Sequence, residues 1–148
     1  MTQDLAQPAW KTVAILIARL IYAGLFIMAA AFKFSDIQAT AAFIAGAGFP
    51  VPLFLACCAA LFECLLILGF LSGAFFSEIA LLAAVYVLFL AFSFHGPGRW
   101  AASQAEFGFF VDHFTFIAGL LFAAVHGPGR VLALRLGFLG RARQEQTA

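Results

Sequence analysis

The chain has 148 residues, of which 65% are hydrophobic and only 10% are charged. These values exclude an ordinary soluble domain, in which about half of the residues are apolar and about a quarter are charged. Eight basic and seven acidic residues leave a formal net charge of +1, so no basic surface is present to bind a nucleic-acid backbone. We therefore expect a membrane protein with one domain, residues 1–148, and no nucleic-acid partner.

Four apolar blocks follow one another along the chain. Each has about the 20 residues that carry a helix across the hydrocarbon core of a bilayer. The blocks are residues 13–32, 51–71, 74–94 and 107–125. A bilayer offers no water to unpaired backbone groups, and runs rich in Ala and Leu satisfy these groups as helices. The predicted fold class is all-α, a bundle of four transmembrane helices.

A shorter helix is predicted between the first two spans, over about residues 36–47, lying at the membrane interface. Ser35 and Gln38 have the spacing of a capping box, which marks a helix start. The glycines that follow, and then Pro50, cannot continue a helix and end it. The repeated sequence His-Gly-Pro-Gly-Arg, at 95–99 and again at 126–130, is likewise predicted to end a span each time rather than to form an active motif.

Lysine and arginine placement predicts the orientation. Lys11 precedes the first span and four arginines follow the last one, whereas the two loops on the opposite side contain Lys33 and Arg99. Because cytoplasmic loops carry the excess of basic residues, both termini are expected in the cytoplasm. The basic tail, 127–148, is expected either to lie on anionic lipid headgroups or to be solvated.

Each predicted span contains an ionisable residue, and such residues usually face the bundle interior with a partner, since each costs about 2.5 to 3.5 kcal/mol near the bilayer centre. Counted at about 1.5 Å per residue from the cytoplasmic side, Arg19 and Glu63 lie at similar depths. They are predicted to form a buried structural ion pair. Glu78 and Asp112 are the charged residues of the third and fourth spans.

A second polar group is predicted near the outer membrane face, where Lys33, His95, Asp112 and His113 lie close to the ends of their spans. These side chains either line one pocket or reach separately into headgroups. Tyr22 lies one turn from Arg19 and extends the polar face of the first span.

Metal and haem sites are weaker alternatives. A site made of His95, Asp112 and His113 is disfavoured because adjacent helical residues point about 100° apart, so no metal is expected. Axial ligation of a haem by the two histidines is a further alternative. The three cysteines, at 57, 58 and 64, have neither disulfide nor zinc-site spacing.

Several segments together resemble the DoxX family of membrane proteins. They are the run from Arg19-Leu-Ile-Tyr-Ala-Gly-Leu-Phe to Lys33, Gly-Ala-Gly-Phe-Pro-Val-Pro at 46–52, Phe62-Glu63 followed by Leu68-Gly69, and Gly-Pro-Gly-Arg at 127–130. The resemblance covers almost the whole chain and implies a four-helix protein of the bacterial-type inner membrane. Some relatives are subunits of thiosulfate:quinone oxidoreductases or of other membrane redox complexes. Two segments depart from the family pattern: Ala-Phe-Phe at 74–76, where a basic residue is expected, and Val-Leu-Ala-Leu after Arg130.

Two classes of function are compatible with these residues. The first is a quinone-linked redox subunit, in which Glu63, Asp112 or His113 exchanges the protons of a quinone, and Lys33, His95 and Tyr22 line its site. The sequence has no nucleotide-binding glycine loop and no iron–sulfur spacing, so another subunit would supply the electrons. The second is a structural or assembly subunit of a larger membrane complex. Four short spans make a transporter a distant third.

Overall fold

Five α-helices make up the described part of the chain, in a computed structural model that covers residues 9–101, 103–134 and 136–139. Four of them are long, and no strand occurs in these residues. The elements are α1 (Ala9–Ser35), α2 (Ile37–Gly46), α3 (Pro52–Ser72), α4 (Phe76–His95), the 3-10 turn η1 (Pro97–Arg99) and α5 (Gln104–His126). The predicted all-α fold is confirmed, since each predicted span corresponds to one long helix and the short helix follows the first.

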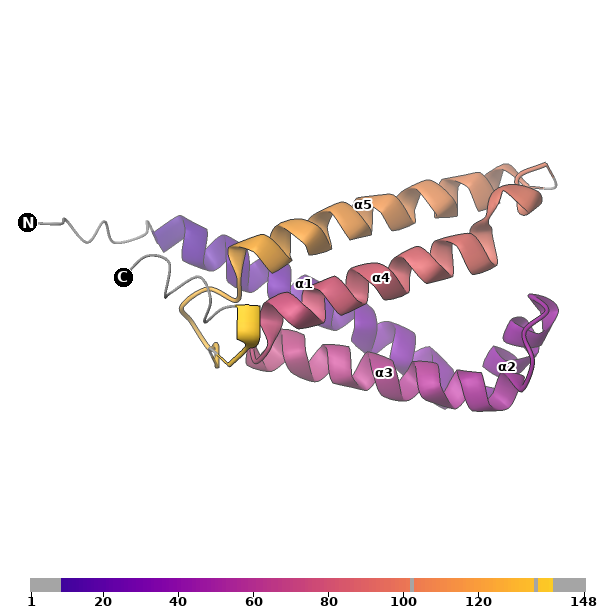
Figure 1. Cartoon of the computed structure of the whole chain (residues 1–148), viewed down its shortest axis with the longest axis horizontal. Coiled ribbons are helices and arrows are strands. Elements are labelled where there is room, and N and C mark those ends of the chain that lie inside the picture. Colours follow the sequence, from indigo (N-terminus) through magenta and orange to yellow (C-terminus); the bar gives the residue numbers. More distant parts are fainter. Residues whose placement is uncertain (1–8, 102, 135, 140–148) are drawn as a thin grey trace, which may run out of the picture.

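The four long helices are long and apolar enough to cross a membrane. They run up and down along one axis, so that the start of α1 and the end of α5 lie at the same end of the bundle (Figure 1). We call this the basal end; it also holds the turn between α3 and α4. The opposite end, with the start of α3 and the turn between α4 and α5, is the distal end.

The helices pack in two pairs. α1 lies mainly against α3, and α5 lies mainly against α4. The two pairs meet at the basal end, while α3 and α4 diverge toward the distal end, where α2 packs on α3 (Figure 1). Alanines fill the contacts between helices: Ala56, Ala60, Ala80 and Ala83 are fully buried. Small side chains let helix backbones approach closely, which is the usual basis of helix association in lipid.

Most helix ends follow from local residues. Asp36 caps α2, its carboxylate accepting the N–H of Ala39 at 2.8 Å, so it takes the place of the predicted capping box at Ser35. Gly73 ends α3 in the left-handed conformation, which glycine adopts without steric cost. Both copies of the His-Gly-Pro-Gly-Arg repeat end a helix, as predicted, because α4 stops at His95 and α5 at His126.

Arg19 is buried at the basal end and bonds only to backbone carbonyls among the described residues. It is 3% exposed, and its guanidinium donates five hydrogen bonds, which is the full number of N–H groups that an arginine has. The acceptors are the carbonyl oxygens of Phe70 (3.1 Å), Leu71 (2.9 Å), Pro128 (3.0 Å), Val131 (2.9 Å) and Leu132 (2.9 Å). Arg19 therefore joins α1 to the last turn of α3 and to the segment after α5.

The segment after α5 is held against the turn between α3 and α4. Besides its bonds to Arg19, the Leu134 N–H donates to the carbonyl of Ser72 at 2.8 Å. Glu78, in the first turn of α4, accepts the N–H groups of Phe138 and Leu139 at 2.6 and 2.8 Å. This part of the predicted headgroup-binding tail is thus docked on the protein itself. The arginines at 135, 141 and 143 lie outside the described residues.

Replacing Arg19 by lysine should destabilise the protein even though the charge is kept. Lysine has three N–H groups, so at least two of the five carbonyls lose their donor. Hydrogen bonds to charged groups are worth about 1.5 to 3 kcal/mol each, so we expect a loss of at least about 3 kcal/mol in the free energy of unfolding. Unfolding by SDS in mixed micelles measures it.

Arg99→Lys is the matched control for that experiment. Arg99 also lies near a helix end, but its side chain makes no hydrogen bond to the described residues, so its replacement should leave stability within about 0.5 kcal/mol of the parent. Equal effects of the two substitutions would contradict the role given to Arg19.

Candidate functional site

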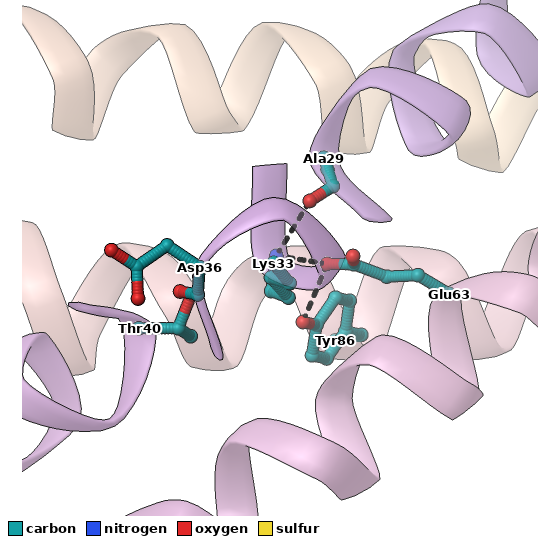
Figure 2. Close-up of polar contacts among 6 residues, drawn as sticks. All are labelled: Ala29, Lys33, Asp36, Thr40, Glu63 and Tyr86. Carbon is teal, nitrogen blue, oxygen red and sulfur yellow. Dashed lines mark hydrogen bonds and ion pairs between the residues drawn. The ribbon is translucent and has the colours of Figure 1, made fainter. Parts of the chain in front are cut away.

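An ion pair links the last turn of α1 to the middle of α3. The Lys33 Nζ lies 2.8 Å from the Oε1 of Glu63, and it also donates to the carbonyl of Ala29 at 3.4 Å (Figure 2). The Glu63 side chain is 2% exposed and that of Lys33 is 20% exposed. The Glu63 side chain is thus almost completely buried within the protein, whereas part of the Lys33 side chain lies at the protein surface.

Tyr86, on α4, completes this polar group. Its hydroxyl donates to the same Oε1 of Glu63 at 2.9 Å, so one carboxylate oxygen accepts from both Lys33 and Tyr86 (Figure 2). The other oxygen, Oε2, is buried and has no hydrogen-bond partner among the described residues. A buried acceptor left unpaired costs about 1 to 3 kcal/mol or more when it is charged, so this atom is suited to accept a bond from a further group. We call Lys33, Glu63 and Tyr86 the carboxylate triad.

An apolar cavity of about 450 Å³ adjoins the triad between α2, α3 and α4. Tyr86 belongs both to the triad and to the cavity wall, where its ring packs edge-on against Phe62 at 5.1 Å between centroids. The full lining is Ile44, Phe49, Leu55, Cys58, Ala59, Phe62, Tyr86, Phe89, Leu90 and Phe94. Small-molecule sites in proteins have this character: a few hundred Å³ of mostly apolar wall with a small number of placed polar groups.

The predicted ion pair between Arg19 and Glu63 is wrong. Arg19 bonds to carbonyls at the basal end, and Glu63 bonds to Lys33 and Tyr86. Similar depth along the bundle was not sufficient, because side chains on a helix lean toward the start of their own helix. α1 and α3 run in opposite directions, so Arg19 leans toward the basal end and Glu63 toward the distal end. Lys33, beyond Glu63 on α1, leans back toward it.

The four residues predicted to line one outer pocket lie at three separate places in the structure. Lys33 belongs to the carboxylate triad, and Asp112 is exposed on α5 without a hydrogen bond to any described residue. His95 and His113 do come together, with ring centroids 5.2 Å apart, and Glu106 joins them through His95.

Tyr22 is placed between helices rather than beside the cavity. Its hydroxyl donates to the Phe116 carbonyl at 3.3 Å, and its ring stacks on Phe70 at 5.6 Å. It therefore contacts α3 and α5 from α1. The proton-exchange and ligand-binding roles assigned from the sequence to Glu63, Asp112, His113, Lys33, His95 and Tyr22 stay predictions.

Sequence analysis missed two residues of these clusters, Tyr86 and Glu106. The chain has only two tyrosines, and Tyr86 is the one polar side chain in the apolar run 79–92 of the third span, which was an available signal. Glu106 lies across the short loop from His95, so the turn between the third and fourth spans could have suggested the pair. Neither residue belongs to a recognisable motif.

Four apolar helices of membrane-spanning length define a multi-pass membrane protein. The family model that matches the chain is DoxX, over residues 14–96. This match covers more than half of the sequence, so the chain belongs to the DoxX family. It includes all three residues of the carboxylate triad and every residue that lines the cavity. No curated protein and no solved structure gave a significant match.

Lys33→Met should destabilise the protein more than Glu63→Gln does. The first substitution strands a carboxylate whose side chain is 2% exposed, whereas the second strands an ammonium whose side chain is 20% exposed and flexible enough to reorient toward the protein surface. Breaking a buried pair costs about 3 to 5 kcal/mol, and we expect Lys33→Met to fall in this range and Glu63→Gln below it. Unfolding in mixed micelles measures both.

The double variant Lys33→Met with Glu63→Gln removes both charges and should be more stable than Lys33→Met alone. Additive losses in the double variant would show that the two side chains are not coupled and would contradict the pairing.

Proposed function

We propose that this chain is a membrane subunit of a quinone-linked redox complex and that its apolar cavity binds the quinone head group beside Tyr86. The observation that carries the proposal is the cavity of about 450 Å³, whose wall contains one hydroxyl, and that hydroxyl is bonded to a buried carboxylate with an unpaired oxygen. Membership of the DoxX family is compatible with this role.

The chemistry of a quinone requires groups of this kind. A quinone and its quinol differ by two electrons and two protons, so the ring oxygens must exchange protons with the protein or with water. The Tyr86 hydroxyl donates its only hydrogen to Glu63, so in this proposal it accepts a hydrogen bond from a quinol hydroxyl in the cavity and passes its own proton on to Glu63. The phenylalanines of the wall provide an apolar surface for the ring.

Lys33 has two roles in this proposal. Its ammonium stabilises the charged form of Glu63, since an opposite charge 2.8 Å away offsets part of the cost of burial. Because its side chain is 20% exposed, we propose that it also links the buried carboxylate with the protein surface. The electrons come from a redox group of a partner subunit, because the sequence carries no nucleotide-binding loop or iron–sulfur spacing.

Filling the cavity should reduce the quinone that copurifies with the protein. Ala59 lies in the cavity wall, so Ala59→Phe places a ring in the space where the head group would bind. We expect at least a tenfold loss of bound quinone relative to the parent, measured by mass spectrometry of the extract after purification in mild detergent. Ala118→Phe, at an exposed position of α5, is the matched control and should retain the parent level.

Tyr86→Phe distinguishes the redox role from a purely structural one. It keeps the ring and removes the hydroxyl that bonds Glu63. Loss of quinone-dependent turnover in an otherwise intact complex supports the redox role. No quinone in the parent extract, or unchanged turnover in both Ala59→Phe and Tyr86→Phe, would leave the structural or assembly role.

We also propose that the basal end faces the cytoplasm and the distal end faces outward, on the basis of the basic residues that flank α1 and α5. In a variant without the three native cysteines, a cysteine placed at Ser103, just before α5, should react in intact cells with a thiol reagent that does not cross membranes. Reaction only after the membrane is disrupted would reverse the orientation.

A further inference from the structure

Asp112 is a carboxylate without a partner inside a membrane-spanning helix. It is exposed on α5, and no described residue forms a hydrogen bond or an ion pair with it. Because α5 begins at Gln104, Asp112 lies about 12 Å along the span. An ionisable side chain at such a depth is costly in lipid, and in membrane proteins it usually faces a partner. Neither the packing of the bundle nor the proposed quinone site uses this side chain.

The face of α5 that carries Asp112 points away from the helix on which α5 packs. α5 lies mainly against α4, where Phe110 and Phe114 contact Phe92 with ring centroids 5.2 and 6.3 Å apart. Both phenylalanines are two residues from Asp112, so they lie on nearly the opposite side of the helix. Only 6% of the span in α5 is buried, against 22 to 39% in the other three spans. Of the four spans, α5 therefore has the largest surface that the bundle leaves uncovered.

α1 covers this face of α5 only toward the basal end. The Tyr22 hydroxyl bonds to the Phe116 carbonyl, and a Cβ added at Gly119 would overlap that hydroxyl, so the two helices are in close contact there. Asp112 lies on the same face two turns nearer the distal end. One turn further, a Cβ added at Gly108 would meet no described atom within 4 Å. At the level of Asp112 another helix thus has room to approach closely.

We propose that this face of α5 docks a transmembrane helix of a partner protein, and that a lysine or an arginine in the apolar run of that helix pairs with Asp112. Charge complementarity carries the choice of partner, because an opposite charge close by stabilises a carboxylate that has been removed from water. The proposal rests on α5 alone and does not depend on quinone binding in the cavity.

A second copy of this chain does not fit as the occupant. In a twofold dimer through this face the two Asp112 carboxylates would face each other, and like charges repel. Arg19 and Lys33 of the second copy are already bonded within their own chain. The other lysines and arginines of the described residues lie at the basal end, at Lys11 and Arg130, or on the turn beyond α4, at Arg99.

Photocrosslinking in the native membrane identifies the chain that covers this face. Phe116, one turn from Asp112, is replaced by p-benzoylphenylalanine, which keeps the aromatic ring. Phe122 is the matched control, because it is also an exposed phenylalanine of α5 but points about 120° away from Phe116. We expect a crosslink from position 116 to an apolar peptide that contains a lysine or an arginine, with a yield at least fivefold above that from position 122.

Substitutions of Asp112 test the charge. Asp112→Asn keeps the shape of the side chain and removes its charge, whereas Asp112→Glu keeps the charge. Because Asp112 is exposed and unbonded among the described residues, both variants should fold as the parent does. The crosslink from position 116 should fall at least fivefold in Asp112→Asn and keep at least half of its yield in Asp112→Glu. Replacing the lysine or arginine of the captured helix by methionine should lower the yield as much as Asp112→Asn does.

Several results overturn the proposal. They are a crosslink from position 116 to a second copy of this chain, to lipid alone, or to a helix without a lysine or arginine in its apolar run. The absence of any crosslink, equal yields from positions 116 and 122, or an unchanged yield in Asp112→Asn has the same consequence.

Discussion

Within an antiparallel helix bundle, each long side chain leans toward the start of its own helix, and this lean decides which charges can meet. In an apolar bundle the consequence is large, because a charge without a partner is costly. Arg19 leans toward the basal end and bonds to carbonyl oxygens there. Glu63, on the antiparallel helix α3, leans toward the distal end and pairs with Lys33. The positions of the buried charges thus follow from helix direction as much as from depth.

The two buried charged residues, Arg19 and Glu63, lie in parts of the bundle that are packed differently. At the basal end, the five bonds of Arg19 join α1, α3 and the segment after α5, and Glu78 holds that segment from α4. Toward the distal end α3 and α4 diverge, and the cavity lies there under α2 (Figure 1). The hydrogen bonds that join the helices are thus concentrated at the basal end, and the cavity lies toward the other end.

The carboxylate triad and the histidine pair stand in different relation to the family. The carboxylate triad and the cavity lie entirely within the segment that matches DoxX, whereas the histidine pair draws on α5, which lies beyond it. The quinone proposal therefore concerns a part of the chain that the family model covers, whereas the histidine pair depends on the fourth span of this chain. Glu106 and His113 lie seven residues apart on one face of α5, which places both beside His95.

By itself the sequence determined the membrane class, the number of spans and their approximate limits. An apolar run of about 20 residues satisfies its own backbone hydrogen bonds as a helix in the bilayer, so each span can be recognised without knowledge of its neighbours. The sequence also indicated which charges were unusual, since Arg19, Lys33 and Glu63 interrupt apolar runs. Only the tertiary structure decided their partners. Every residue has a backbone carbonyl, so the residue types do not show which carbonyls Arg19 bonds to. The cavity beside Tyr86 exists only where α3 and α4 diverge. These features depend on angles and directions between helices, which are set by the packing of the whole bundle.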